Sequence, residues 1–147
     1  MVTGEVKSME LKTHITCRLV KSEDLNHHGT LFAGKTAMWF VESGFIAAAS
    51  LTHPENIVCV NIHGMLFTRP VLSGQIIRFE SKVVLAGKTR LVSYVRVVNN
   101  SSNEFCLDGF ISFVHVDLKG KSLPHGIKID PTVPEDIALQ EKAKNLR

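Results

Sequence analysis

The chain is short of cysteine and has no pattern typical of a structural metal site. Its 147 residues include three cysteines, and Cys17, Cys59 and Cys106 lie far apart, outside any C-x-x-C pair and away from histidines at ligand spacing. Neither a disulfide framework nor a bound metal is therefore expected. Unpaired cysteines are typical of a reducing compartment. We expect a cytoplasmic protein.

Long hydrophobic segments and an excess of charge of one sign are also missing. The longest apolar stretch, residues 36–51, contains Glu42 and is shorter than the roughly 20 residues that cross a bilayer. The first ten residues, MVTGEVKSME, hold no apolar run, so no signal peptide is expected. Seventeen Lys and Arg against fourteen Asp and Glu give a net charge of +3, with the basic residues scattered. Neither a membrane segment nor nucleic-acid binding is predicted.

The chain does have enough apolar material for one packed domain. Hydrophobic residues make up 44% of the sequence, and a chain of this length buries roughly 68–70% of its unfolded surface. We therefore treat residues 1–147 as a single domain with its core at about 11–118. Residues 119–147 are rich in Lys, Pro and Gly and are expected to form a peripheral C-terminal tail, with a short polar helix over 135–145.

Hydrophobic patterning predicts one long helix among five strands. Strict alternation over residues 11–19 predicts a strand, and turn residues over 21–34 predict a structured loop. Residues 35–51 form helices well and are apolar on nearly every side, and Pro54 ends this helix. Four β-rich runs follow, at residues 57–68, 74–86, 89–99 and 105–118. This order predicts an α+β fold in which an antiparallel five-stranded sheet wraps around the helix.

The predicted helix has more apolar surface than one curved sheet can cover. Because the sheet can enclose only part of its circumference, we expect a second subunit to close the remainder, which makes the protein at least a dimer.

Glu42 is the first candidate for chemistry. It is the only charged residue between Thr36 and Leu51, and a carboxylate on an enclosed helix is costly unless it is paired, protonated or facing a cavity. One interpretation is a glutamate at a solvated edge of the helix or bonded to neighbouring backbone. The other is a general base or nucleophile in a pocket.

The second candidate is the loop over residues 26–34, NHHGTLFAG, which brings small residues to the start of the helix. Unpaired amides at a helix N-terminus can bind an anion or an oxyanion, and Ala33 and Gly34 would let a carbonyl approach closely. An ordinary capped helix start explains the same composition. Gly34 and Glu42 are eight residues, or about 12 Å, apart on one helix. They could share a site only if two helices lie antiparallel across a dimer axis.

Three segments carry a resemblance to a known family. The stretch NHHGTLFAGKTAMWFVESGFIAAAS resembles the loop and central helix of hot-dog-fold acyl-CoA thioesterases, in which N-H-x-G-T-L-F-G-G precedes an apolar helix with an acidic residue. FTRPVLSGQIIRFES resembles the family's F-x-x-P-V-x-x-G-D-x-I segment, and VLAGKTRLVSYVRV resembles its V-G-x-T-S hairpin. The resemblance covers about residues 11–118.

The resemblance implies a hot-dog fold and hydrolysis of an acyl-CoA thioester, with no cofactor beyond the CoA of the substrate. It also implies a homodimer with active sites at the interface, and a trimer of dimers as a further assembly. Asn26 matches the family's active-site Asn and would position the water or the thioester. The amide of Ala33 or Gly34 would polarise the carbonyl, and Glu42 would act as the base. The family's usual acidic position falls on Val41, one residue earlier.

Coenzyme A needs cations for its phosphates. Arg69, Lys88 and Arg90 are the candidates from their places in the family-like motifs, although exposed Lys and Arg are ordinary at any surface. His28 on the loop and His63 in the strand predicted at residues 57–68 are further candidates for contact with the substrate. A core or edge role is the simpler interpretation of a single strand histidine.

Two other functions fit the same residues. With Val41 at the usual acidic position, the protein would be an acyl-CoA binding or sensing module without hydrolysis. With His63 poised over the acyl chain next to an acid, it would be a hot-dog dehydratase that acts on 3-hydroxyacyl thioesters.

Overall fold

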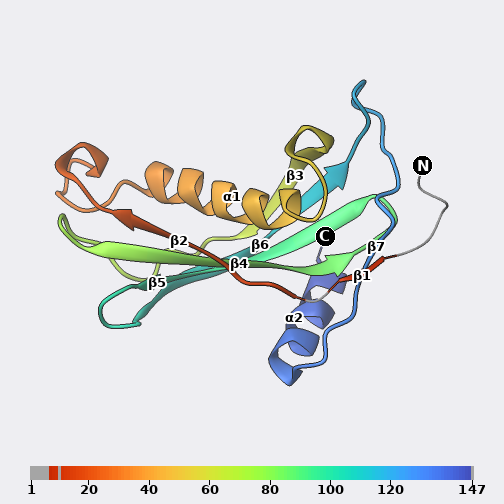
Figure 1. Cartoon of the computed structure of the whole chain (residues 1–147). Coiled ribbons are helices and arrows are strands. Elements are labelled where there is room, and N and C mark those ends of the chain that lie inside the picture. Colours follow the sequence, from red (N-terminus) through yellow and green to blue (C-terminus); the bar gives the residue numbers. More distant parts are fainter. Residues whose placement is uncertain (1–6, 10, 147) are drawn as a thin grey trace.

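The computed structural model describes residues 7–9 and 11–146, and the expectation about a signal peptide falls largely on residues outside these ranges. Within these ranges, seven strands, two α-helices and two short 3₁₀ helices follow one another (Figure 1). In order they are β1 (Lys7–Met9), β2 (His14–Leu19), η1 (Ser22–Asp24), α1 (Ala33–Ala49), η2 (Pro54–Asn56), β3 (Ile57–Gly64), β4 (Ile76–Ala86), β5 (Arg90–Asn99), β6 (Phe105–His115), β7 (Ile127–Ile129) and α2 (Pro134–Lys144).

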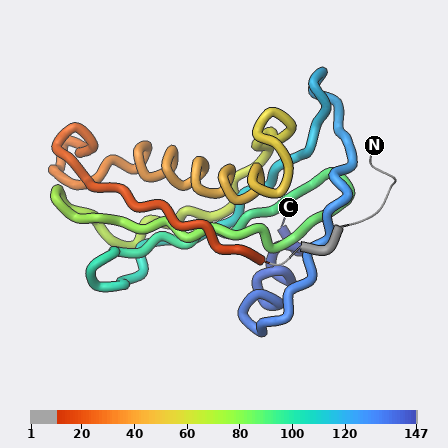
Figure 2. The backbone as a smooth tube through the Cα atoms, in the orientation of Figure 1, coloured from red at the N-terminus to blue at the C-terminus, as the bar shows by residue number. Residues whose placement is uncertain are grey.

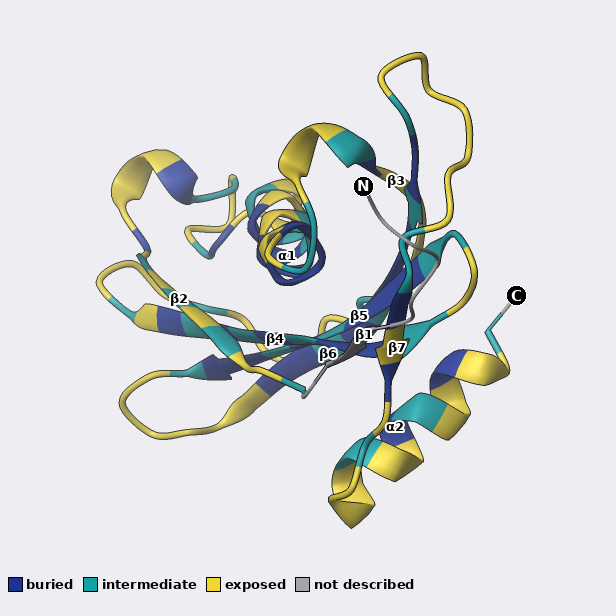
Figure 3. Ribbon diagram, turned by 45° about the vertical axis from the view of Figure 1, so that its right-hand side comes forward, coloured by how far each residue is buried: buried dark blue, intermediate teal, exposed yellow. Residues whose placement is uncertain are grey.

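Five strands form one antiparallel sheet in the order β2-β4-β5-β6-β3. Helix α1 runs along one face of this sheet, and α2 lies against the other face (Figures 2 and 3). The architecture confirms the α+β fold predicted from the sequence, with one antiparallel sheet around a long helix.

The contact between α1 and the sheet is close and partly polar. Two fully buried serines of the sheet, Ser81 and Ser93, donate hydrogen bonds of 2.8 Å to the helix carbonyls of Ser43 and Gly44. A Cβ at Gly44 would lie 2.6 Å from Cδ1 of Ile111. Glycine therefore lets the helix backbone approach the sheet closely enough for these bonds to form.

One face of α1 is open in the single chain, although the sequence predicts a helix apolar on almost every side. Gly34, Met38, Glu42 and Ile46 are exposed at intervals of four residues, and we call this row the exposed ridge. Met38 is 53% exposed and Ile46 37%. The sheet covers the opposite side of the helix, as Figure 3 shows. A ridge that exposes Met38 and Ile46 in this way is a surface that a partner helix can cover.

Several boundaries differ from the sequence prediction. Strand β2, predicted to begin at residue 11, begins at His14, where its pairing with Ser81 of β4 starts. The third strand stops at Gly64 instead of residue 68, because Gly64 and Met65 both take positive φ angles, +101° and +75°, and turn the chain out of the sheet. The sixth strand, β6, stops at His115 instead of residue 118.

The C-terminal segment is more closely integrated than a peripheral tail. Strand β7 pairs in parallel with β1 in a small second sheet, and the buried side chains Leu139 and Ala143 of α2 pack on Val84 and Val92 of the main sheet. Both helices and both sheets therefore belong to one packed unit. Within the described ranges, no helix is long and apolar enough to cross a membrane.

Candidate functional site

Asn26 organises the loop that leads into α1. Its Oδ1 accepts hydrogen bonds from the amides of His28, at 2.8 Å, and Thr30, at 3.2 Å. Its Nδ2 donates to Oγ1 of Thr30 at 3.1 Å. One side chain thus fixes a four-residue turn in the manner of an Asx turn, and one Nδ2 proton remains for another acceptor.

Asp24 ties the same loop to the beginning of the helix. Its carboxylate is buried, accepts a 3.0 Å bond from the amide of Lys21 and lies 3.5 Å from Nζ of Lys35. The Lys21 amide, followed by the bond and charge of Lys35, holds the pKa of Asp24 below its usual value despite burial. The carbonyl of Asp24 accepts from the amide of Phe32. The residues at the helix start are therefore held on both sides.

The first amides of α1 find no acceptor in the part of the chain that the structure describes. Phe32 occupies the N-cap position, where its side chain has no atom that can accept a hydrogen bond. Its carbonyl accepts from Lys35 and Thr36, whereas the amides of Ala33 and Gly34 have no acceptor among the described residues. The sequence allowed two interpretations of this helix start, an ordinary capped start and a site for an anion. An uncapped start with two adjacent donors fits the second interpretation.

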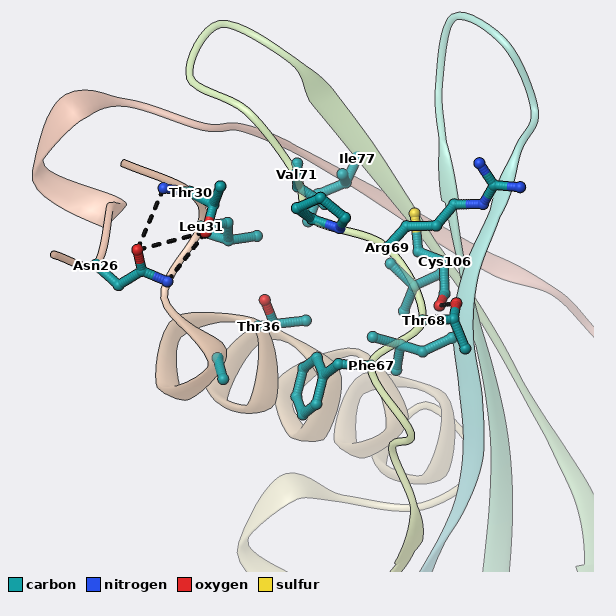
Figure 4. A pocket seen from close by; sticks show the side chains of 14 residues that line it. Asn26, Thr30, Leu31, Thr36, Phe67, Thr68, Arg69, Val71, Ile77 and Cys106 are labelled. Carbon is teal, nitrogen blue, oxygen red and sulfur yellow. Dashed lines mark hydrogen bonds between the residues drawn. The ribbon is translucent and has the colours of Figure 1, made fainter. Parts of the chain in front are cut away.

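A cavity of about 290 Å³ lies beside this helix start (Figure 4). Its walls come from the Asn26 loop, the first turn of α1, the segment after β3 and the ends of β4, β5 and β6 that face the helix start. The lining residues are Asn26, Thr30, Leu31, Ala33, Thr36, Phe67, Thr68, Arg69, Pro70, Val71, Ile77, Val97, Cys106 and Leu107. Most of the wall is apolar, as in pockets that bind small organic ligands.

Three of the residues proposed from the sequence line this cavity: Asn26, Ala33 and Arg69. Gly34 follows Ala33 and lies beneath the Phe32 ring, since a Cβ there would come within 2.4 Å of Cε2. The Arg69 guanidinium is exposed and lies 3.1 Å from a carboxylate oxygen of Glu104. Arg69 therefore stands at the rim, as Figure 4 shows.

Glu42 lies on the exposed ridge and outside the cavity wall. Its carboxylate is half exposed and forms an ion pair with Arg18 of β2, whose guanidinium carbon lies 5.5 Å from the centroid of the Trp39 ring. Val41, at the position where the family carries its acid, packs against the core. An acid at residue 42 therefore faces the surface that a partner would cover.

His63 and Arg90 meet on the face of the sheet that lies away from α1. Nε2 of His63 is 3.0 Å from Oγ of Ser112, which also accepts a 2.8 Å bond from Arg90. Burial and the Arg90 charge lower the pKa of His63. His63 is opposite Phe110, and Phe110 belongs to the cluster beneath α2. His63 and the cavity of the same chain are thus on opposite faces of the sheet.

The remaining candidates lie on exposed turns. His28 is exposed at the tip of the loop, with its ring centroid 3.9 Å from that of His27. Lys88 is exposed in the turn between β4 and β5, at the end of the sheet opposite Val97 and Cys106. Neither lines the cavity of its own chain.

Sequence reasoning missed the residues that shape the cavity. Thr36, Phe67 and Cys106 all line it, and among them only Thr36 had a usable signal, since it is three residues after Ala33 on the same side of a helix. Phe67 was assigned to a strand that ends before it. In the part of the chain that the structure describes, no group of three or more His, Cys, Asp or Glu residues could hold a metal ion.

A sheet wrapped around one helix, with free amides and a cavity at the start of that helix, defines a hot-dog protein with a site for a carbonyl or an anion. The sequence model of the thioesterase superfamily matches residues 28–106, more than half of the chain. The protein belongs to this superfamily, which confirms the family resemblance found in the sequence.

Individual relatives agree with this assignment. A Bacillus subtilis (strain 168) protein described as the uncharacterized acyl-CoA thioester hydrolase YkhA is 27% identical over 124 residues, which cover 82% of this chain and 71% of the relative. A crystal structure of an apo-hexameric acyl-CoA thioesterase is 28% identical with a TM-score of 0.82, covering 95% of this chain and 92% of the other. The hexameric hotdog fold thioesterase Cj0915 of Campylobacter jejuni is 26% identical with a TM-score of 0.66, covering 86% and 94%.

Proposed function

We propose that this protein is an acyl-CoA thioesterase, which adds water to an acyl-CoA thioester and releases a carboxylic acid and the CoA thiol. The observation that carries the proposal is the pair of unpaired amides at Ala33 and Gly34, directly beside an apolar cavity. Membership of the thioesterase superfamily and the acyl-CoA hydrolases among the relatives support it.

The helix start supplies carbonyl polarisation. When the thioester carbonyl oxygen accepts hydrogen bonds from Ala33 and Gly34, the negative charge that develops on it during attack is stabilised by two fixed donors and by the helix dipole. The second Nδ2 proton of Asn26 can hold the thioester or the attacking water at the same edge of the cavity. A thioester needs only water, a base and this polarisation, so no resident cofactor is invoked.

Glu42 is proposed as the general base, acting on the site of the partner chain. Gly34 and Glu42 flank Met38 symmetrically on the exposed ridge. If two copies of α1 pack antiparallel with Met38 at the twofold axis, Glu42 of one copy comes opposite Gly34 of the other. Each dimer would then contain two sites, with amides from one chain and a carboxylate from its partner. Arg18 keeps the carboxylate oriented in the meantime.

The open edge of the sheet supports the same dimer. Strand β3 is an edge strand, and Val58, Val60 and Ile62 on it are 43%, 57% and 41% exposed. An exposed apolar edge invites a further strand. Pairing of two β3 edges beside the helix contact would join the sheets, and the relatives named above as hexamers fit three such dimers.

The cations assigned to coenzyme A divide between the chains in this arrangement. Arg69 would contact the phosphates at the rim of its own cavity, together with His28 on the neighbouring loop. Lys88 and Arg90 are at the opposite end of the sheet and would reach the partner's cavity. His63 is bonded to Ser112 beneath Arg90, so its contribution would be to hold Arg90 in place. The three free cysteines favour a reducing compartment, and we propose the cytoplasm.

The second candidate function is acyl-CoA binding without hydrolysis. The ion pair of Glu42 with Arg18 favours it, since the carboxylate oxygen Oε1 is already bonded to a guanidinium. The dehydratase hypothesis has less support, because His63 and the cavity of its own chain are on opposite faces of the sheet.

One experiment separates these functions. The purified protein is incubated with acyl-CoAs of increasing chain length and a thiol reagent that reports free CoA, and binding is measured in parallel by calorimetry. Release of CoA at many turnovers per site supports the thioesterase. Tight binding with no CoA release would instead support the binding module. Hydration of crotonyl-CoA, followed by its ultraviolet absorbance, would indicate the dehydratase.

A further inference from the structure

One threonine hydroxyl in the cavity wall has no hydrogen-bond partner among the described residues. Thr36 is 5% exposed, lines the cavity from the first turn of α1, and forms no side-chain hydrogen bond. The other threonines of the wall are satisfied: Thr30 bonds to Asn26, and Thr68 donates to the carbonyl of Cys106. Thr36 therefore differs from these two threonines, because its side chain is more than nine-tenths buried in the wall while its hydroxyl is not bonded to any described residue.

The Thr36 hydroxyl does not form the hydrogen bond to helix backbone that is open to a helical threonine. A helical threonine can donate to the carbonyl four residues earlier, which here belongs to Phe32. That carbonyl already accepts hydrogen bonds from the amides of Lys35 and Thr36. The Thr36 side chain points instead away from the helix, toward the space between Leu31 and Val71 (Figure 4). Because no described protein group bonds this hydroxyl, it is available to a ligand in the cavity, as donor or as acceptor.

The surroundings of Thr36 restrict the ligand to one with an apolar body and a single polar group. The residues deeper in the cavity are aliphatic: Leu31, Val71, Ile77, Val97 and Leu107. Such a wall suits a short acyl chain. One hydroxyl among apolar side chains can recognise a polar substituent on a single carbon atom of that acyl chain.

The position of Thr36 relative to the free amides indicates which carbon atom of the acyl chain lies near the hydroxyl. Thr36 follows Ala33 by three residues, about 4.5 Å along the axis, and helical side chains lean back toward the N-terminus. In a thioester whose carbonyl is held at Ala33 and Gly34, C3 of the acyl group is two bonds of about 1.5 Å from the carbonyl carbon. An oxygen on C3 then comes within hydrogen-bonding reach of the Thr36 hydroxyl.

We infer that Thr36 is a specificity-determining residue that recognises an oxygen on C3 of the acyl chain, so that short 3-hydroxyacyl- and 3-oxoacyl-CoA thioesters are the preferred substrates. This inference rests on the proposed thioesterase function. A threonine hydroxyl both donates and accepts, so it serves either oxygen, as donor to a ketone or as partner of an alcohol.

The test compares substrates that differ only at C3. We expect kcat/KM for 3-hydroxybutyryl-CoA or acetoacetyl-CoA to exceed that for butyryl-CoA by about tenfold or more in the unaltered protein, the factor that one completed hydrogen bond supplies. In Thr36→Val, which keeps the shape and removes the hydroxyl, this ratio should fall to about one. Thr36→Ser, which restores a hydroxyl, should recover most of it.

Thr68→Val is the matched control, because it removes a hydroxyl from the same wall that is already bonded to backbone, and it should retain the ratio. Equal use of all substrates by the unaltered protein, or a parallel loss for every substrate in Thr36→Val, would overturn the inference. If no thioester is hydrolysed, the proposed function fails. The same ratio measured as Kd by calorimetry, with and without Thr36→Val, then decides the inference separately.

Discussion

Two adjacent residues of α1, Val41 and Glu42, have different surroundings, and the acid occupies the more exposed of the two positions. One step around α1 is about 100°, and it separates Val41, which packs on the core, from Glu42, which lies on the exposed ridge beside Arg18. A carboxylate at residue 41 would have to be accommodated next to apolar side chains, whereas at residue 42 it is solvated and paired. The carboxylate therefore lies at the surface where a partner would bind.

Replacement of Glu42 tests its proposed role as the base. We expect Glu42→Gln to lower kcat by a factor on the order of 10² or more, because the amide cannot accept the proton of the attacking water. The measurement is steady-state hydrolysis with a thiol reagent, on protein whose unfolding curve matches that of the unaltered chain.

Glu141→Gln is the control for this charge change, since Glu141 is an exposed residue of α2 that pairs with Lys144. It should keep full activity. A loss of less than about threefold in Glu42→Gln would remove Glu42 from the mechanism.

His125 provides a pH-dependent contribution to stability. Its Nε2 donates to the carbonyl of Arg90 at 3.0 Å, and its Nδ1 accepts from the amide of Ile127 at 2.9 Å. Both bonds together require the neutral ring. Burial, opposed by the bond to Arg90 and assisted by nearby His115, lowers the pKa of His125 below the usual 6.5. The unfolded chain therefore binds a proton more readily than the folded one.

The sign of this linkage gives a prediction. The stability that the neutral ring contributes is complete above about pH 6.5 and is lost as the pH falls from there through the lower folded pKa. We expect the free energy of unfolding in urea to decrease between pH 7.5 and 5.5, and to decrease less in His125→Gln. In His53→Gln, a change at an exposed position, the free energy of unfolding should depend on pH as it does in the unaltered protein. Identical pH profiles for all three proteins would exclude this role for His125.

At the scale of elements, the packing of α1 on the sheet depends on Gly44. A Cβ there would lie 2.6 Å from Cδ1 of Ile111 and 3.2 Å from Cγ2 of Val95, and both neighbours are fully buried. Displacement of the helix would also lengthen the bond from Ser93 to the Gly44 carbonyl. The steric cost opposes the higher helix propensity of alanine, which is about 1 kcal/mol.

We expect Gly44→Ala to destabilise the fold by about 1–2 kcal/mol, because overpacking of a tight core outweighs helix propensity. Ile111→Val removes the clashing methyl and is expected to cost about 0.5–1.5 kcal/mol by itself. Denaturant unfolding of both variants and of the double variant forms a thermodynamic cycle. The double variant should be more stable than the sum of the single effects implies, whereas strict additivity would contradict the contact.

The long elements were predictable from the sequence, and the short ones were not. Alternation and helix composition located α1 and all five strands of the main sheet, because each carries several periods of its pattern. Strands β1 and β7 have three residues each, too few to show alternation. The face of His63 was also beyond prediction, since a register shift between Cys59 and Asn61 interrupts the alternation along β3.

The candidate site was partly predictable for a related reason. Asn26, Ala33 and Gly34 are contiguous with the helix start, so local sequence was enough to propose them. The cavity wall is built by segments distant in the chain, such as residues 67–71 and the start of β6, and only the folded sheet brings these to α1. Sequence spacing likewise could not reveal that the N-cap position lacks a side-chain acceptor.

At the scale of the whole molecule, the proposed dimer uses two open surfaces of the described chain, the exposed ridge of α1 and the edge of β3. Both expose apolar side chains, such as Met38 and Val60, and both would be covered in the proposed dimer. Activity in that dimer needs two chains, because the amides and the carboxylate of one chain are about 12 Å apart along α1.

A charge on the β3 edge tests this dependence. We expect Val60→Lys to shift the protein toward monomer in analytical ultracentrifugation and to reduce hydrolysis in proportion, because an edge lysine opposes strand pairing. Leu118→Lys, at an apolar position that is 87% exposed outside the β3 edge, should change neither. A monomeric Val60→Lys variant with full activity would contradict a site shared between chains.

The uncapped start of α1 also affects the end of the catalytic cycle. Hydrolysis turns a neutral carbonyl into a carboxylate, and a helix start with two free amides binds an anion better than a neutral group. The carboxylic acid product should therefore dissociate slowly from the helix start, and its release should limit turnover. Progress curves that slow earlier when the acid is supplied at the outset would reveal this product inhibition, and the same acid should raise the melting temperature of the protein.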